Sequence, residues 1–296
     1  MGTAGLLTGA NAGPLYGLRK ARRSATARAG LVLVGLLVAF ALVGPLVAKH
    51  DAFTSDFVRG VTPEHLPVGP NAEFWLGSDR LFRDVFARLA VGARMSLVIG
   101  IGATAIATAL GSAVGILAGY HEGRWIDTLL MRVVDVGLAF PFLLIVMALG
   151  AALDRTTAST IFLTLGLTGW IGVARIVRAK TLQLRDLDYI VAARALGQTT
   201  PRILVRHLLP NIAGPIVVVA TILVAQMILA ESVLSYLGAG IAPPTPTWGH
   251  MLFEGQDYLG AAPWITAAPA VAILLSVLGF NLLGEGLRDA LDPRKT

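Results

Sequence analysis

The chain has 296 residues, of which 55% are hydrophobic and 14% charged, and its mean hydropathy is +0.72. Soluble domains carry about 25% charged residues, so this composition excludes a soluble enzyme, a disordered chain and a fibrous protein. The absence of cysteine excludes a disulfide framework, a cysteine-bound zinc site and a thiol nucleophile. The net charge of +6 could indicate a nucleic-acid partner, but the positions of the charges relate it to membrane topology.

Six charge-free runs are long enough to cross a membrane, which takes about 20 apolar residues. They are residues 29–48, 95–120, 136–153, 156–174, 207–230 and 258–284. The first run is too long for the apolar part of a signal peptide, so we expect an uncleaved span. A seventh run, 232–253, contains three prolines and predicts a loop or re-entrant segment. The sequence therefore predicts an all-α polytopic membrane protein with six transmembrane helices.

The lysines and arginines predict the orientation of these spans. With six spans, 17 of them fall on the side of both termini and 7 on the other side, which favours cytoplasmic termini. The basic excess then contacts anionic membrane lipid rather than nucleic acid. The predicted segments are a basic cytoplasmic tail (1–28), the first span (29–48), an extracytoplasmic segment (49–94), a five-helix membrane core (95–290) with a cytoplasmic loop (175–213), and a cytoplasmic C-terminus (291–296).

The extracytoplasmic segment divides into two halves. Prolines and a glycine in its first half predict an irregular loop. In the second half, Ser78 is a candidate cap for an amphipathic helix that ends at Arg94. Asp79 with Arg83 and Asp84 with Arg88 have the i,i+4 spacing of helix ion pairs. We expect this helix to lie on the outer membrane surface and to lead into the second span.

The cytoplasmic loop contains residues that typically begin and end helices, and they predict two short helices. Asp188 is a candidate N-cap and Gly197 a candidate residue just after the helix end, where a left-handed backbone is common. Thr200 then precedes Pro201, a good first helical residue, and Pro210 marks the start of the fifth span. The sequence predicts two helices, 188–196 and 201–208, bent at Gly197.

The chain shows no catalytic constellation. It has no Gly-Lys dipeptide and so no phosphate-binding loop, and its five histidines lack metal-ligand spacing. The predicted spans contain few ionisable groups, and such groups often mark a transport path. Glu231, with Ser235 one turn later, is therefore a candidate for the translocation path. In the second span, Gly111, Gly115 and Gly119 form a ridge of small residues that favours packing against another helix of the chain.

The cytoplasmic loop resembles the EAA loop of ATP-binding-cassette (ABC) importer permeases. The resemblance rests on Ala192-Ala193-x3-Gly197 and on Arg206-His207-Leu208-Leu209-Pro210-Asn211, which is similar to the dipeptide/oligopeptide branch of that family. It extends over roughly residues 30–292 and includes the Leu76-Gly77-Ser78-Asp79 and Glu231-Ser232 segments. Two positions differ from the pattern of that family: Val191 stands in place of the motif's glutamate, and Phe82 in place of a glycine that precedes Arg-Asp.

The resemblance implies a permease subunit with a type I ABC importer fold in the bacterial cytoplasmic membrane. It implies a second homologous permease chain, two ATPase subunits that carry the ATP and magnesium, and an extracytoplasmic peptide-binding protein as partners, with no cofactor on this chain. The implied ATPase-coupling residues are Ala192, Ala193, Arg194, Gly197, Arg202, Ile203, Leu204, His207 and Pro210. Among them, Arg194 and Arg202 are expected to offer charges to the ATPase, and Ile203 and Leu204 to fill its groove.

Two other interpretations remain open at this stage. A proton-coupled secondary transporter would also have several spans, but it would usually show repeated halves with interrupted helices or mid-span carboxylates. An importer of the same family could carry nickel complexes or haem instead of dipeptides or oligopeptides.

Overall fold

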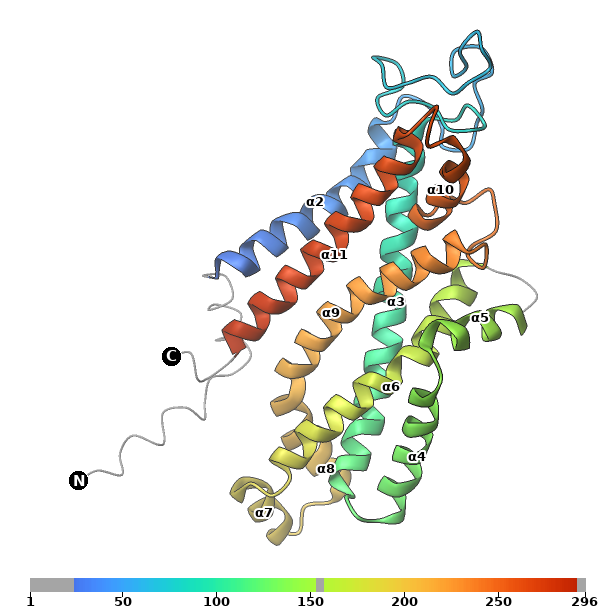
Figure 1. Ribbon diagram of the computed structural model, residues 1–296. Helices are drawn as coiled ribbons and strands as arrows, with labels where there is room; N and C mark the ends of the chain where they lie inside the picture. The colour runs from blue at the N-terminus through green and yellow to red at the C-terminus, as the bar shows by residue number, and fades with distance from the viewer. Residues whose placement is uncertain (1–23, 153–156, 292–296) are drawn as a thin grey trace.

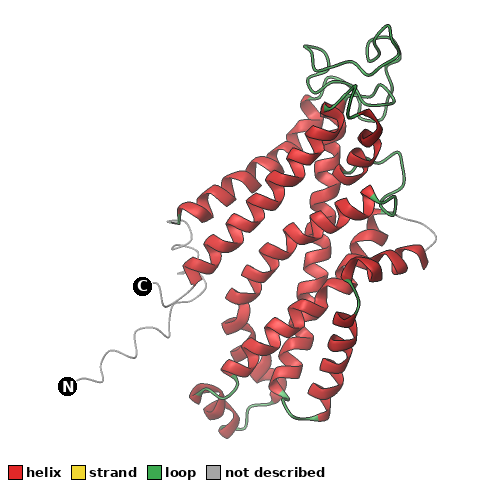
Figure 2. Ribbon diagram, viewed as in Figure 1, coloured by secondary structure: helices red, strands yellow, loops and turns green. Residues whose placement is uncertain are grey.

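The computed structural model describes residues 24–152 and 157–291, in which helices are joined by loops and no β-strand occurs (Figure 2). The long helices are α2 (Ala25–Val47), α3 (Val85–Tyr120), α6 (Ala158–Leu184), α9 (Leu209–Tyr236) and α11 (Trp264–Leu291). The short helices are α4 (Trp125–Ala139), α5 (Phe142–Ala152), α7 (Asp188–Ala195), α8 (Thr200–Ile203) and α10 (Trp248–Gly255). The five long helices are each long and apolar enough to cross a membrane. The chain is therefore an all-α, multi-span membrane protein, and most of the predicted basic tail lies outside the described residues.

The predicted third span, 136–153, is not one straight helix. Its place is taken by α4 and α5, which meet at an angle of 92°. The break falls at Phe140 and Pro141, because a residue before proline is driven into an extended conformation and Phe140 has ψ 141°. The structure thus has five straight candidate spans and a sixth only if the bent pair crosses as one unit.

Helix α3 runs through the centre of the bundle (Figure 1). The expected glycine ridge packs it against α6: a Cβ added to Gly111 would lie 2.6 Å from Val173 Cβ, and one added to Gly115 would lie 2.6 Å from Ala174 O. Helix α2 lies along α11, where Gly30 leaves no room for a side chain against the backbone of Leu283. Close helix approach through small residues is the main packing device of this fold.

The predicted amphipathic helix from Ser78 to Arg94 starts too early. Residues 78–84 form turns, and Asp84, not Ser78, caps α3 by accepting the backbone N–H groups of Phe86 (2.8 Å) and Ala87 (3.3 Å). The Asp79 carboxylate competes with helix formation because it accepts the N–H groups of Leu81 and Arg83. The stretch from Val85 onward is the first part of the 36-residue α3 rather than a separate surface helix.

The proline-rich run 232–253 forms three pieces. Its start completes α9, its prolines lie in the connection after α9, and its end forms α10. Thr247 caps α10 by accepting the N–H of His250. Helix α10 packs against α9, α11 and α3 at the end of the bundle where the 48–84 loops also gather (Figure 1).

Candidate functional site

The coupling loop, residues 187–211, lies at the opposite end of the bundle from α10 (Figure 1). Helix α7 ends in a Schellman motif: Gly197 N–H donates to Arg194 O, and Gln198 N–H donates to Ala193 O. This motif needs a left-handed residue, and Gly197 has φ +74°. The predicted bend at Gly197 is confirmed, whereas Asp188 lies in the first turn of α7 and Leu187 is the N-cap.

The second half of the loop is continuous with the membrane helix that follows. Thr199, one residue before the predicted cap, precedes α8, and a π-helical turn (Leu204–Leu208) joins α8 to α9. Pro210 has no N–H to donate, and Leu209 N–H bonds back to Leu204 O. His207 Nε2 lies 2.9 Å from Gln198 Oε1 and so ties this turn to the Schellman motif. The predicted separate helix 201–208 is instead the start of a continuous 37-residue helix.

The packing of the coupling loop separates its inner from its outer side chains. Ile190, Ala193, Ile203 and Leu208 are buried in the chain's own core, and Leu204 packs against that core. Ile203 is fully buried, so it cannot fill a groove on a partner. Leu196 and Val205 are 82% and 65% exposed and are the apolar side chains that the loop offers to a partner.

The basic side chains of the coupling loop also divide into one that contacts its own chain and others that are exposed. The Arg194 guanidinium lies 5.4 Å from the centre of the Tyr120 ring and so contacts its own chain. Arg202 and Arg206 are exposed and make no ion pair within the described residues. Ala192 is also exposed. The loop is a compact knob that presents apolar side chains and free positive charge.

Ion pairs hold the neighbouring helices of this end in place. Arg178 on α6 donates two hydrogen bonds of 2.8 Å to the Asp127 carboxylate on α4. Arg185, at the end of α6, forms ion pairs with Glu122 and Asp186. The coupling loop therefore projects from helices that ion pairs hold together.

The bend between α4 and α5 borders a cavity of about 600 Å³, here called the bend cavity. Its lining is almost wholly apolar and comes from α4, α5, α6 and α9. Gln226, in the middle of α9, is an exposed polar side chain on this wall. Broken helices at membrane depth occur where the backbone is covered by protein or lines a cavity.

Glu231 and Ser235 are both buried and line none of the described cavities. Ser235 Oγ donates to one oxygen of Glu231 (2.7 Å), and Ser96 Oγ donates to the other (3.3 Å). This placement joins α9 to α3 and favours a structural role for the carboxylate.

Sequence reasoning missed a buried ion cluster at the α10 end, here called the Glu254 cluster. Glu254 accepts hydrogen bonds from Arg83 (2.9 Å) and Arg88 (2.7 Å), and Asp79 pairs with the same two arginines at 2.7 and 3.1 Å. Burial alone would raise the pKa of Glu254, but the nearby His250 ring and the charges of Arg88 and Arg83 hold that pKa well below its usual range. The cluster joins α10 to the start of α3.

The helices and the knob define a polytopic membrane component built to work with other proteins. A family model described as binding-protein-dependent transport system inner membrane component matches residues 111–296. A second, described as the N-terminal transmembrane domain of oligopeptide transport permease C, matches residues 16–61. The chain belongs to this family of inner-membrane permease components.

Relatives match nearly the whole chain. The dipeptide transport system permease protein DppC of Alkalihalophilus pseudofirmus is 37% identical over 93% of this chain and 88% of its own length. The oligopeptide transport system permease protein OppC of Bacillus subtilis is 38% identical, with coverages of 92% and 87%. The glutathione transport system permease protein GsiD of Escherichia coli O157:H7 is 41% identical, with coverages of 93% and 89%.

The fold also matches a solved structure. A chain of the MetNI methionine ABC transporter, in inward-facing conformations, aligns with a TM-score of 0.55 at 20% identity. The alignment covers 69% of this chain and 96% of that one. The expected type I importer permease fold is therefore confirmed.

Proposed function

We propose that this chain is the permease subunit of an ATP-driven importer of short peptides. The observation that carries the proposal is the identity of 37–41% over at least 92% of the chain with permeases named for dipeptides, oligopeptides and glutathione. All three cargoes contain peptide bonds, which favours a peptide over a nickel complex or haem. A proton-coupled transporter is disfavoured because interrupted helices there recur in both halves, and the described residues hold one bent pair.

The coupling loop is the contact for separate ATPase subunits, which carry ATP and magnesium. Leu196 and Val205 supply exposed apolar surface, and Arg202 and Arg206 supply positive charge that forms no ion pair among residues 24–152 and 157–291. Such a surface suits a groove with an acidic rim. The Schellman motif and the His207–Gln198 contact make the knob rigid, so a push from the ATPase can reach α9 directly.

The bend cavity is this chain's part of the translocation path. The exposed Gln226 amide offers polar groups on an almost wholly apolar wall, beside the break between α4 and α5. Broken helices often mark the transport site of membrane carriers. A second, homologous permease closes the path from the other side. The excess of basic residues supports a cytoplasmic position for the coupling loop and both termini, with the α10 end facing the peptide-binding protein.

Uptake by whole cells tests the proposed cargo. Cells without this chain should lose uptake of labelled dipeptides, oligopeptides or glutathione, while uptake of free amino acids stays unchanged. Expression of the chain from a plasmid should restore uptake. Unchanged uptake of all three peptide classes, in a strain with no second peptide importer, would contradict the proposal.

A further inference from the structure

The bend cavity offers no charged group to a cargo, although a short peptide is charged at both ends. Of the described residues that line it, only Thr168 and Gln226 have polar side chains, and Thr168 Oγ1 already donates to Thr164 O (2.8 Å). A free peptide carries an ammonium group and a carboxylate at neutral pH, and both are unfavourable in an apolar medium. A peptide therefore needs charged partners at the edge of this cavity.

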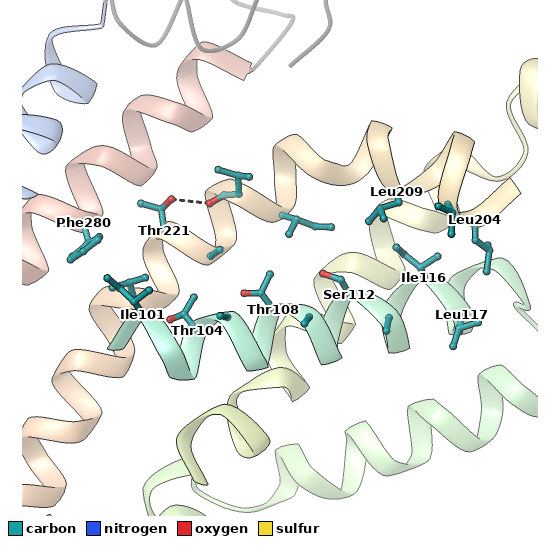
Figure 3. A pocket seen from close by; sticks show the side chains of 18 of the residues that line it. Ile101, Thr104, Thr108, Ser112, Ile116, Leu117, Leu204, Leu209, Thr221 and Phe280 are labelled. Atoms are coloured by element: carbon teal, nitrogen blue, oxygen red, sulfur yellow. Dashed lines mark hydrogen bonds between the residues drawn. The ribbon is translucent and has the colours of Figure 1, made fainter. Parts of the chain in front are cut away.

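A second cavity, of about 820 Å³, lies between α3, α9 and α11 and offers hydroxyl groups instead of charges. Figure 3 shows Thr104, Thr108 and Ser112 projecting from α3 into the space that faces α9. Hydroxyl groups form hydrogen bonds but do not neutralise a charge, and no charged residue of the described chain lines this cavity. Charged partners for a peptide must therefore come from the edge of a cavity rather than from its walls.

Asp135 and Arg175 lie at the edge of the bend cavity that is nearer to the coupling loop. Helix α4 begins and helix α6 ends at that end of the bundle (Figure 1). On α4, Asp135 comes shortly before Gly137, the first residue of that helix to line the cavity. On α6, Arg175 comes directly before Ile176, the last lining residue of that helix. The two side chains thus stand on two facing walls at one end of the cavity.

The Asp135–Arg175 pair is exposed and only partly satisfied. The two side chains are 52% and 58% exposed, and a single hydrogen bond joins them, from Arg175 Nη2 to Asp135 Oδ1 (2.7 Å). Asp127 on α4, in contrast, uses both of its oxygens to bind Arg178, and its side chain is only 8% exposed. An exposed ion pair contributes little to stability, so the Asp135–Arg175 pair can exchange its partners at little cost.

The position of the Asp135–Arg175 pair along the two spans suits a release point. Asp135 directly precedes the charge-free run 136–153, and Arg175 directly follows the run 156–174. Both charges therefore lie where the apolar part of the spans ends on the coupling-loop side. Glu231 is next to a lining residue of α9, but it is fully buried and so is out of reach of a cargo.

We propose that Asp135 and Arg175 bind the two charged ends of a peptide as it passes from the bend cavity to the cytoplasm. This inference rests on the proposed function, which supplies the peptide. The Asp135 carboxylate accepts hydrogen bonds from the terminal ammonium group, and the Arg175 guanidinium donates to the terminal carboxylate. The long side chain of Arg175 can move away to make room, because the two Cα atoms of a dipeptide are about 3.8 Å apart. Since the pair has no net charge, it favours a cargo with both charges over a cargo with one.

Uptake of chemically blocked dipeptides tests this assignment. ATP-driven uptake into proteoliposomes that contain the whole complex is measured for a labelled dipeptide, its C-terminal amide and its N-acetyl derivative. We expect Arg175→Gln to lower uptake of the dipeptide and the N-acetyl form about tenfold, the factor for one hydrogen bond to a charged group, and uptake of the amide about twofold or less. Asp135→Asn should instead spare the N-acetyl form. Each variant is compared with the parent for the same cargo, so any preference of the peptide-binding protein cancels.

Arg59→Gln is the matched control for the uptake measurement. The Arg59 side chain is 58% exposed, as is that of Arg175, and its ion pairs lie at the other end of the molecule. This variant should change the uptake of all three cargoes by the same factor. The same result with Arg175→Gln and Asp135→Asn would show that their pair only joins α4 to α6, and it would overturn the assignment.

Protection of a thiol tests the site without delivery by the peptide-binding protein. The chain has no cysteine, so Ile176→Cys places one thiol in this chain, in the cavity lining beside Arg175. In inside-out vesicles with the whole complex, we expect a dipeptide at about ten times its dissociation constant to slow the reaction with a charged thiol reagent about tenfold. The N-acetyl dipeptide amide should not slow it, nor should the dipeptide when Arg175→Gln is added.

Two results of the thiol measurement would overturn the assignment: equal reaction rates with both peptides, or a thiol at position 176 that does not react. Failure of the parent complex to take up any dipeptide, whether free or blocked, would instead overturn the proposed function, on which the assignment depends.

Discussion

The two ends of the helical bundle use charge in opposite ways. At the α10 end, Asp79, Arg83, Arg88 and Glu254 are each at most 6% exposed and pair with one another. At the coupling-loop end, Arg202 and Arg206 are exposed and have no ion-pair partner within the described chain, and Leu196 is 82% exposed. The charges of the first end are paired within the chain, whereas those of the second end are exposed and suit the partner that we propose.

Because of this contrast, we expect substitutions at one end to change the stability of the protein and substitutions at the other end to change its binding to partners. Charges that are buried and paired are expensive to disrupt, so changes at the Glu254 cluster should unfold the protein. Exposed charges contribute little to stability, so changes in the coupling loop should alter partner binding and leave the fold intact. A variant that behaves in the opposite way at either end would break the comparison.

The largest expected effect follows from removing Arg88. Arg88→Met leaves Glu254 and Asp79 with one shared arginine, and breaking a buried ion pair costs about 3–5 kcal/mol. We expect the apparent Tm of the purified protein to fall by roughly 6 °C or more. Arg59→Met, which removes an exposed pair with Asp56 and Glu73, is the matched control and should change Tm by about 2 °C or less. Equal shifts for the two variants would contradict the assigned difference in burial.

The pH dependence of unfolding examines the same cluster without disrupting its packing. Because the pKa of Glu254 is lowered in the folded protein, its ionised form contributes stability above the ordinary value of 4.5. That contribution is lost as the pH falls below this value. We expect the Tm of the parent to drop more steeply between pH 5 and roughly pH 3 than that of Glu254→Gln. Parallel curves for the two proteins would show that Glu254 is not the titrating group.

A smaller effect is expected where α2 meets α3. Pro45 has no N–H for the carbonyl of Ala41, and Arg94 Nε donates to that oxygen instead (2.6 Å). Arg94→Met should cost about 1.5 kcal/mol in the parent, because it leaves this carbonyl unpaired. The same change in a Pro45→Ala background should cost clearly less, since the new N–H can take over. A double-mutant cycle measures this coupling, and additive effects would show that the two residues act independently.

The smallest effect concerns Phe82, which stands in place of the glycine expected from the motif that the sequence resembles. Its φ is +59°, a left-handed conformation that costs a side chain about 1–2 kcal/mol. Phe82→Gly relieves this strain but loses the edge contact with Phe57. Phe82→Ala loses the contact and keeps most of the strain. We therefore expect the glycine variant to be about 1 kcal/mol more stable than the alanine variant, measured by denaturant unfolding. The reverse order would show that the turn can relax.

The structural features that could be predicted from the sequence are those that depend on residues close together in the chain. Charge-free runs located the long helices, and cap residues located the bend at Gly197 to the residue. Charge counting missed the break at Pro141, because proline is uncharged and the run looked continuous. The Glu254 cluster was missed because Glu254 lies 166 positions from Arg88, while local spacing paired Arg88 with Asp84, which caps α3 instead. The coupling motif was visible, but only the fold shows that Ile203 faces inward.

We propose that the coupling loop transmits ATPase motion to the membrane helices. Gly197 and Gly123 offer a matched pair for its test. Both have positive φ (+74° and +75°), and neither has a neighbour within 4 Å of an added Cβ. The connection from α3 to α4, which contains Gly123, and the loop between α7 and α8, which contains Gly197, lie at the same end of the molecule (Figure 1). Valine at either position strains the backbone by a similar amount, but only Gly197 belongs to the coupling loop.

ATP-driven uptake of a labelled dipeptide into proteoliposomes, with equal amounts of each permease variant in the complex, is the most direct measurement. We expect Gly197→Val to lower uptake and ATPase recovery about tenfold, the factor that corresponds to 1.4 kcal/mol. Gly123→Val should retain parental values for both. Undiminished uptake with Gly197→Val, or equal losses for the two variants, would contradict a coupling role for this loop.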